Sequence, residues 1–312
     1  MTIAVLRTAD AWWVQTRSGA AQIDTVAATT GELLADRTAI EIAAASKTTA
    51  DIDSLQLVSP VTAPCRVIAQ MTNFVSHVTD SGMDPKTIPL TFFRKSSASI
   101  TGPFGDIVKP AHVQLLDYEV EVGLVIGRGV PVGTSLTAAD LPEVVAGLVV
   151  TNDVSARDIQ LPQTQFYEAK SYPSFTPVGP ALVLLDADDW KRFGDLHLRL
   201  KVNGELRQDM HVGPDMIYKP LKALQSLTRF QDLSAGDLIL TGTPVGTALS
   251  APPKPIELIG ALLPPALKWR AFFKRQASNP KYLHHGDVVE AGVATDDGAI
   301  DLGTQRNTVH YA

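Results

Sequence analysis

The chain has 312 residues, of which 45% are hydrophobic and 19% charged, and its formal net charge at pH 7 is −6. This acidic balance, without a long basic run, argues against densely anionic partners, so we expect neither nucleic-acid binding nor attachment to a membrane. The one cysteine, Cys65, excludes an intrachain disulfide, and no apolar run approaches the ~20 residues of a membrane span, which predicts a soluble cytoplasmic protein.

The first 62 residues have the pattern of a small separate unit. Residues 2–26 alternate apolar and polar side chains in short stretches, as strands do, with Gly19 at a turn. Residues 30–45 have a weak helical pattern, and Pro60 and Pro64 end the region. We therefore predict a small N-terminal α/β cap domain over residues 1–62 and a main domain over residues 63–312.

The main domain is expected to be rich in strands. The pair Asn203-Gly204 is a strong signal for a tight hairpin, and residues 216–230 form an amphipathic helical pattern. Stretches typical of strands are residues 67–69, 119–126, 146–152, 181–185, 196–202, 238–241 and 288–293. Many strands with few helices favour a β-rich α+β fold over a doubly wound one.

Three carboxylates alternate with other residues in the stretch 115–126. Residues two apart on a strand share a face, so Asp117, Glu119 and Glu121 are expected to point the same way. One interpretation is an edge strand whose acidic face is solvated. The other is a site for a hard cation such as Mg²⁺, Mn²⁺ or Ca²⁺. The stretch alone slightly favours the edge strand.

A further carboxylate, Asp153, follows directly after the apolar stretch 146–152. A carboxylate at the end of a buried strand is well placed to be a third metal ligand. The alternative is that Asp153 or Ser155 caps a short helix that runs to Gln160. Taken alone, the helix cap is the simpler interpretation.

Several motifs, taken in their order along the chain, resemble the fumarylacetoacetate hydrolase family. They are DYEVEVG at 117–123, TNDVSARD at 151–158, KSY at 170–172, PVGP at 177–180, VNGE at 202–205, GDLILTGTP at 236–244 and GDVVE at 286–290. Each motif alone is a weak signal, but the ordered set runs from about residue 67 to residue 309. The resemblance implies a mixed β-sandwich roll, a homodimer, and a metal-dependent enzyme acting on β-diketones or 2-oxo acids.

The resemblance also implies a metal centre. Glu119, Glu121 and Asp153 would bind Mg²⁺, or else Mn²⁺ or Ca²⁺, and leave positions for substrate oxygens. Asp117 would be a structural acid. Lys170, which without the resemblance is interpreted as a solvated surface lysine, would place a second positive charge near the substrate oxygens.

The segment 71–80 resembles the part of the family that supplies a general base. His77 and Asp80 have the i, i+3 spacing that puts two side chains on one helix face, and a carboxylate beside a histidine raises its basicity. The resemblance implies that His77 activates a water molecule. Asp80 stands where the family usually has glutamate, one methylene longer. The plain alternative is a surface histidine.

Four further residues are predicted to support substrate binding. Arg157 and Gln160 fall on the short helix after Asp153, Thr243 lies in the motif 241–244, and Lys95 follows an aromatic pair. A helix surface, ordinary turn chemistry and a solvated charge are the respective alternatives.

An insertion-like loop spans about residues 251–283. It contains the aromatic residues Trp269, Phe272 and Phe273. Such residues fit local packing or a dimer contact as well as a wall for a bulky hydrophobic substrate, and both interpretations stay open.

The resulting prediction is a divalent-metal-dependent hydrolase that cleaves a C–C bond in a β-diketone or acylpyruvate, such as a ring-fission product of aromatic or alicyclic catabolism. The alternative among enzymes is a decarboxylase, isomerase or hydratase that acts on a 2-oxo acid through the same enolate. The alternative from another class is a catalytically inactive protein of this fold that binds a ligand or a metal.

Overall fold

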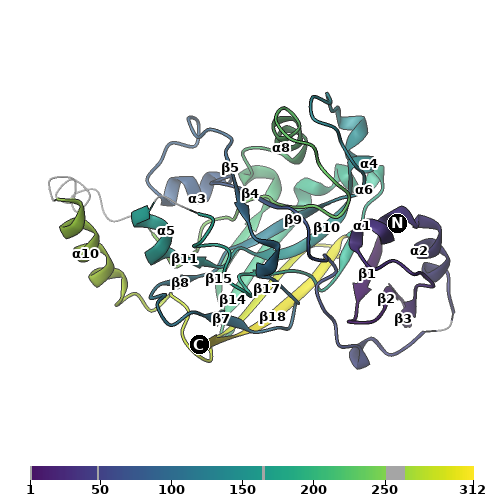
Figure 1. Ribbon diagram of the computed structural model, residues 1–312, viewed down its shortest axis with the longest axis horizontal. Helices are drawn as coiled ribbons and strands as arrows, with labels where there is room; N and C mark the ends of the chain where they lie inside the picture. Colours follow the sequence, from purple (N-terminus) through teal and green to yellow (C-terminus); the bar gives the residue numbers. More distant parts are fainter. Residues whose placement is uncertain (1, 48, 164–165, 251–263) are drawn as a thin grey trace.

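The computed structural model describes residues 2–47, 49–163, 166–250 and 264–312. Most of its strands belong to two sheets (Figure 1). The larger sheet has nine strands in the order β3-β2-β1-β13-β10-β9-β16-β4-β5. The smaller has five in the order β15-β14-β17-β18-β7, and β11-β8 and β12-β6 form two short pairs.

The bounds of the elements are as follows. The nine-stranded sheet contains β1 (Ile3–Arg7), β2 (Trp12–Thr16), β3 (Gly19–Gln22), β4 (Val67–Gln70), β5 (Phe92–Lys95), β9 (Val120–Ile126), β10 (Val145–Asn152), β13 (Leu182–Leu184) and β16 (Leu238–Leu240). The five-stranded sheet contains β7 (Ile107–Lys109), β14 (Leu196–Val202), β15 (Glu205–His211), β17 (Val288–Thr295) and β18 (Asp301–Tyr311). The short pairs use β6 (Ile100–Thr101), β8 (Leu116–Asp117), β11 (Ser155–Ala156) and β12 (Thr176–Pro177).

The helices are short, apart from one near the C-terminus. They are α1 (Thr30–Ala35), α2 (Arg37–Ala44), α3 (Val75–Asp80), α4 (Leu141–Val144), α5 (Arg157–Gln163), α6 (Ala187–Lys191), α7 (Val212–Asp215), α8 (Pro220–Leu227) and α10 (Pro265–Gln276). Single 3₁₀ turns occur at Ile52–Ser54, Ser97–Ser99, Ala138–Asp140 and Phe193–Asp195. None of the helices in these described ranges is long and apolar enough to cross a membrane.

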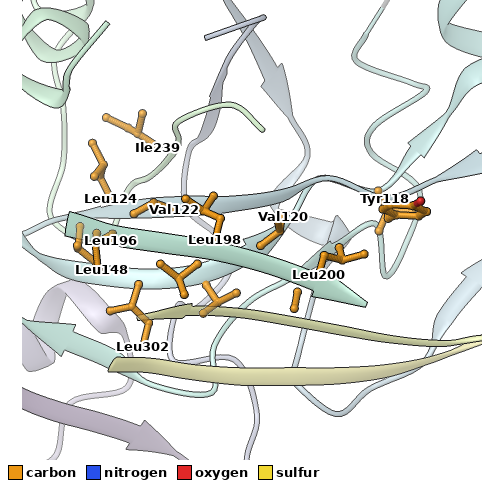
Figure 2. Packing of buried hydrophobic residues seen from close by; sticks show 14 of the residues in the cluster. Tyr118, Val120, Val122, Leu124, Leu148, Leu196, Leu198, Leu200, Ile239 and Leu302 are labelled. Carbon is orange, nitrogen blue, oxygen red and sulfur yellow. The ribbon is translucent and has the colours of Figure 1, made fainter. Parts of the chain in front are cut away.

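The main core lies between the two sheets. Strand β9 lies between β10 and β16 in the sheet, and both of its faces are buried, with Val122 in one apolar cluster and Val125 in the other. On one face Val120, Val122 and Leu124 pack in the same cluster as Leu198 and Leu200 of β14 (Figure 2). The alternation of a strand turns the residues between them to the other face, so this packing directs Glu121 away from the apolar core.

The N-terminal strands continue the larger sheet. Strand β1 pairs antiparallel with β13, and β2 and β3 extend the sheet outward. Helices α1 and α2 contribute Leu33 and Ile40 to a second apolar cluster, which also contains Val67 of β4. Whether residues 1–62 fold as a domain of their own stays a prediction.

The β-rich α+β class predicted from the sequence is confirmed, and the predicted strands all form with small changes at their ends. The hairpin is also confirmed: β14 and β15 are joined by Asn203 and Gly204, both with positive φ. The helix predicted over 216–230 is shorter because it begins at Pro220, whose missing N–H is tolerated only in a first turn. The helical region 30–45 divides at Asp36, whose side chain caps α2.

Candidate active site

Three buried carboxylates meet at one edge of the larger sheet. Glu119 directly precedes β9, Glu121 lies in β9, and Asp153 follows the last residue of the neighbouring strand β10. Antiparallel pairing brings these strand ends together, and the Asp153 N–H donates to the Glu119 carbonyl at 2.8 Å. Each side chain offers an oxygen within 4.8 Å of the others. Only 5%, 1% and 1% of Glu119, Glu121 and Asp153 is exposed.

This burial excludes two of the alternatives. The interpretation as a solvated edge strand is wrong, because β9 is an interior strand of the larger sheet. The helix-cap interpretation of Asp153 is also wrong, because α5 begins four residues later at Arg157. The Ser155 hydroxyl donates to the Asp153 carbonyl at 2.8 Å, and Ser155 itself lies in β11.

Two lysines supply positive charge to the carboxylates. The Lys170 ammonium donates to Glu119 Oε2 and to Asp153 Oδ2, at 2.7 Å in each case. Lys95 donates to Asp153 Oδ1 and, at 2.9 Å, to the Phe175 carbonyl. Both lysines are almost fully buried, so the solvated interpretation of either is wrong. Lys95, predicted to hold a substrate carboxylate, instead bonds Asp153 and is not among the residues that line the cavity.

Asp117 and Arg157 hold the Glu119 side chain in place through hydrogen bonds. Arg157 donates from Nε to Asp117 at 2.9 Å, from Nη1 to Gln160 Oε1 at 2.8 Å, and from Nη2 to Glu119. Asp117 also accepts the N–H groups of Ala248 at 2.7 Å and Leu249 at 3.0 Å. Asp117 therefore has the structural role that the family resemblance implies, and it does not point with Glu119 and Glu121 as the alternation alone predicts. The structure gives Arg157 and Gln160 a positioning task besides their predicted contact with substrate.

The donor set fits a hard divalent cation. Four carboxylates face three cationic side chains, which leaves one uncompensated negative charge in the buried cluster; the members are Asp117, Glu119, Glu121, Asp153, Lys95, Arg157 and Lys170. The uncompensated charge affects Glu121 most. Burial, with repulsion from Asp153 and Glu119, raises the pKa of Glu121 well above the ordinary value. Burial alone would raise the pKa of Glu119 too, but Lys170 and Arg157 hold it well below the usual range. A cation beside Glu121 would relieve the repulsion.

The carboxylates form part of the wall of a cavity of about 770 Å³. His77, Arg157, Gln160, Lys170 and Thr243 line the same cavity. The remaining wall is largely apolar and includes Met71, Ile88, Phe93, Phe166, Leu249, Trp269 and Phe272. The predicted metal ligands and most of the predicted substrate contacts therefore share one cavity.

Helix α10 belongs to the insertion-like loop predicted over residues 251–283, and it lines the cavity. Trp269 and Phe272 of this helix line the cavity together with Lys268 and Arg275. Figure 1 shows α10 at the end of the molecule that carries α3 and α5. The described part of the insertion thus contributes a wall, whereas residues 251–263 lie outside the described residues.

The predicted pair His77 and Asp80 is not formed in this structure. His77 lines the cavity from α3, its Nδ1 is buried without a hydrogen-bond partner, and burial lowers its pKa, so the imidazole is neutral at pH 7. Asp80 is the last residue of α3 and does not line the cavity. Among the described residues no hydrogen bond joins the two side chains, and Asp is one methylene shorter than Glu. Their joint role stays a prediction.

Thr243 contributes to the wall, but its hydroxyl is already engaged. Its Oγ1 donates to the Val120 carbonyl at 2.8 Å and accepts from Gln208 Nε2 at 2.9 Å. The preceding residue, Gly242, donates its N–H to Glu121 at 2.7 Å and has φ +87°. The sequence analysis did not single out Gly242 or Gln208. A glycine between two threonines after a buried strand is the signal that points to such a turn.

Gln70 and Thr91 were also outside the predicted site, although both line the cavity. Gln70 ends strand β4, and Thr91 directly precedes β5. Nothing in the pattern of residues 67–70 marks a polar side chain as functional, so only the tertiary structure reveals them.

A second group of residues could also hold a metal ion: His197, His211 and Asp296 on the five-stranded sheet. Asp296 accepts from both histidines, at 2.9 and 2.8 Å, and from Arg199 at 3.1 Å. The Arg199 guanidinium already supplies positive charge there, and Asp296 is exposed. The buried carboxylates beside the cavity are therefore the better candidate centre.

Comparison with known proteins shows which family this chain matches. The family model described as fumarylacetoacetate (FAA) hydrolase C-terminal matches residues 66–310. A mitochondrial oxaloacetate tautomerase of Rattus norvegicus is 35% identical over 198 residues, which are 62% of this chain and 60% of that protein. The oxaloacetate tautomerase YisK of Bacillus subtilis is 35% identical over 210 residues, which are 65% of this chain and 67% of that protein. The match thus spans less than two thirds of the rat relative.

Solved structures agree over the whole chain. A probable 2-hydroxyhepta-2,4-diene-1,7-dioate isomerase of Mycobacterium abscessus has a TM-score of 0.76 and 29% identity, covering 100% of this chain and 99% of that one. A fumarylacetoacetate hydrolase of Exiguobacterium antarcticum has a TM-score of 0.72 and 26% identity, with both chains covered completely. The resemblance seen in the ordered motifs is therefore confirmed, and the chain belongs to the fumarylacetoacetate hydrolase family.

Proposed function

We propose that this protein is a divalent-metal-dependent tautomerase or isomerase that moves a proton within a 2-oxo acid by way of its enolate. The observation that carries the proposal is the group of three buried carboxylates that shares one cavity with His77, whose Nδ1 is buried without a hydrogen-bond partner. The tautomerase and isomerase names of the relatives support the same reading. It is the alternative raised by the sequence, and we rank it above the hydrolase.

The cation and the side chains would have different tasks in the reaction. Bound by Glu119, Glu121 and Asp153, a divalent cation would supply Lewis-acid stabilisation of negative charge on the substrate oxygens. Lys170 holds Glu119 and Asp153 in place and keeps an ammonium group beside them. Arg157, fixed by Asp117 and Gln160, orients Glu119. The apolar wall limits the access of water, which strengthens these charge interactions.

His77 is the group that moves the proton. A neutral imidazole accepts a proton from the carbon next to the 2-oxo group, and the electron pair of the broken C–H bond passes to the carbonyl oxygen. The same imidazolium then returns the proton to oxygen or to a carbon along the conjugated system. Atoms and charge balance without a co-reactant, and substrate and product are isomers.

The missing His77–Asp80 contact favours isomerisation over hydrolysis. Hydrolysis needs a base strong enough to activate water, and a carboxylate partner provides that basicity. Burial lowers the pKa of His77, and the described hydrogen bonds include none from a carboxylate to its ring. Proton transfer from an acidic carbon next to a carbonyl makes a smaller demand on the base. Hydrolysis of a β-diketone remains the second candidate, supported by the full-length likeness to the Exiguobacterium hydrolase.

The test follows exchange and products in one experiment. Oxaloacetate and a panel of 2,4-dioxo acids are incubated with the enzyme in D₂O, with MnCl₂ or with EDTA, and analysed by NMR and mass spectrometry. We expect metal-dependent deuterium incorporation next to the carbonyl and enol–keto conversion at constant mass apart from deuterium. His77→Gln should reduce the rate about 10²- to 10⁴-fold. The exposed His284, which is not among the residues that line the cavity, provides the control His284→Gln.

Two outcomes decide against the proposal. Release of two fragments in parallel with exchange would identify a hydrolase. Full activity in His77→Gln would remove this residue from the mechanism, whichever product forms.

A further inference from the structure

We propose that helix α10 completes a subsite for a bulky apolar tail on the substrate, through the side chains of Trp269 and Phe272. The subsite deepens the proposed function and rests on it. The substrate class that it defines is a 2-oxo acid or 2,4-dioxo acid whose tail, beyond the reacting carbonyl groups, is an alkyl or aryl group of several carbon atoms.

The first argument is the way α10 is held against the protein. One side of the helix carries residues at the spacing i, i+3, i+4 and i+7, which are Trp269, Phe272, Phe273 and Gln276. Gln276 is buried and accepts from the Tyr282 hydroxyl at 3.2 Å, and Phe273 packs against the main core. The Trp269 ring stacks on Phe273 with centroids 5.7 Å apart. Trp269 and Phe272 both line the cavity, and each keeps part of its surface accessible.

The second argument is that the aromatic wall begins on the face of the sheet that carries Glu121. Phe93 of β5 pairs with Ala69 of β4, and Ala69 pairs with Leu240 of β16. Leu240 pairs in turn with Gly123 of β9. Residues that are paired across a sheet share a face, and so do residues two apart on a strand. Phe93 therefore projects from the same face as Gly123 and Glu121.

Side-chain contacts agree with this register. The Lys170 ammonium, which donates to Glu119 and Asp153, lies 5.6 Å from the centroid of the Phe93 ring. Phe166 packs edge-to-face on Phe93 with centroids 5.2 Å apart, and both rings line the cavity. The apolar surface thus begins one side chain away from the candidate metal ligands, where the tail of a bound 2-oxo acid would leave them.

The third argument is the size of the cavity. Its volume of about 770 Å³ lies within the range of roughly 300–1,000 Å³ that is typical of pockets for drug-sized ligands. The reacting part of a 2-oxo acid fills only the few atoms' space beside the carboxylates. Aliphatic residues extend the aromatic surface over the rest; among them are Met71, Met83, Ile88, Pro89, Leu161 and Leu249. Transfer of an apolar tail from water to such a surface is favourable.

Two competing explanations concern the same helix. A second copy of the chain could cover Trp269 and Phe272, in which case the length of a substrate tail has no influence. Lys268 and Arg275 also line the cavity and are exposed, so they could bind a carboxylate at the end of the tail instead. The substrate series below separates an apolar tail from both.

The experiment varies the tail while the reacting group stays constant. The panel consists of 2,4-dioxo acids with methyl, propyl, pentyl and phenyl tails, and of one whose chain of pentyl length ends in a carboxylate. The values of kcat and KM for tautomerisation are measured with saturating MnCl₂ for wild type, Trp269→Ser, Trp269→Phe and Phe272→Ser. The control is Phe230→Ser, because Phe230 is 64% exposed and is not among the residues that line the cavity. The melting temperature and the oligomeric state of each variant are measured in parallel.

For wild type we expect kcat/KM to rise about two- to fourfold for each added methylene, mainly through a lower KM. The phenyl tail should also exceed the methyl tail. The pentyl-to-methyl ratio of kcat/KM should fall about tenfold in Trp269→Ser and in Phe272→Ser. Trp269→Phe should keep most of this ratio, and Phe230→Ser should keep all of it. Because the ratio compares two substrates of one variant, a general loss of active enzyme does not change it.

The outcomes separate this inference from the proposed function. A wild type that converts none of the panel would refute both. If wild type cleaves the panel into fragments, the proposed function fails, and the same ratio measured on hydrolysis still decides the subsite. A ratio near one in wild type, or an unchanged ratio in both serine variants, would refute the subsite alone. A preference for the carboxylate tail over the pentyl tail would also overturn it, as would a serine variant that changes the oligomeric state but not the ratio.

Discussion

The substitution Glu121→Gln should have opposite effects on stability with and without a divalent cation. Glutamine keeps the size of the side chain and an oxygen that accepts the Gly242 N–H, but it removes one of three clustered negative charges. Without the cation the variant should be more stable than wild type, because two like-charged neighbours no longer repel residue 121. With the cation it should be less stable, because a ligand is lost.

The magnitudes follow from the geometry. Two unit charges 4.8 Å apart, the upper limit of the separations within the group, repel by about 3 kcal/mol at an effective dielectric constant of 20. The ammonium of Lys170 offsets part of this, and the raised pKa of Glu121 favours uptake of a proton, which relieves the repulsion further. We expect a net gain of about 1–3 kcal/mol for the cation-free variant. For wild type, a cation at 100 times its dissociation constant adds about 2.7 kcal/mol. In a protein of this size 1 kcal/mol shifts the melting temperature by about 2 °C.

Thermal unfolding measured after EDTA treatment, and again with millimolar MgCl₂ or MnCl₂, tests both signs. The control is Glu41→Gln, whose exposed carboxylate forms an i, i+4 pair with Arg37. We expect the two unfolding curves to change order only for residue 121. A variant that is less stable than wild type in EDTA, or that gains as much from the cation as wild type does, would refute the reasoning.

Three other predictions concern stability and reactivity. Arg157→Met, which leaves two buried carboxylates without their guanidinium, should lower the free energy of unfolding by about 3–5 kcal/mol in urea titrations, whereas Arg37→Met at the exposed pair should lower it by about 0.5 kcal/mol or less. Burial raises the pKa of Cys65 to about 12, so the thiol stays protonated at pH 8 and should react with a disulfide reagent roughly 30-fold more slowly than in the unfolded chain; equal rates would contradict this. Gly242→Ala should lose about 1–2 kcal/mol because φ there is +87°, and its smaller melting-temperature gain with MnCl₂ would show that the N–H bonded to Glu121 has moved.

The sequence predicts the strands well because they leave local signals. For Glu119, Glu121 and Asp153 the local patterns alone favour an edge strand and a helix cap, and only the ordered family motifs predict that these acids belong to one site. Apolar stretches of strand length mark β9 and β10, and the acids stand at their ends. The same local rule misplaces Asp117. Alternation would turn it the same way as Glu119 and Glu121, but β8 ends at Asp117 and β9 begins at Val120. The break lets Asp117 bond Arg157 and the backbone at 248–249 instead of meeting Glu119, Glu121 and Asp153 as a possible metal ligand.

Burial of charged and polar side chains is the part that the sequence does not reveal. The partners of Lys95 lie 58 and 80 residues away, and the segment that contains it looks like any strand end with a solvated lysine. Gln70 is buried because other parts of the chain cover both faces of β4, where Ile68 lies in one apolar cluster and Ala69 in the other. The helix predicted over residues 216–230 is too long because the apolar pattern extends beyond α8, which begins at Pro220.

The charge balance of the buried cluster indicates the charge of the substrate that the proposed reaction would take. The cluster of four carboxylates and three cationic side chains carries one net negative charge, so a divalent cation would leave it with one net positive charge. A 2-oxo acid with one carboxylate makes the whole assembly neutral, and transfer of a proton to His77 on enolisation leaves that total unchanged. A dicarboxylate such as oxaloacetate adds a further negative charge, and the described cationic side chains of the cavity outside the cluster are Lys268 and Arg275 of α10. Lys268 and Arg275 on α10 are exposed, so water screens much of their charge. The charge of the cluster thus favours a monoanionic 2-oxo acid, and a dicarboxylate such as oxaloacetate should be turned over with a higher KM.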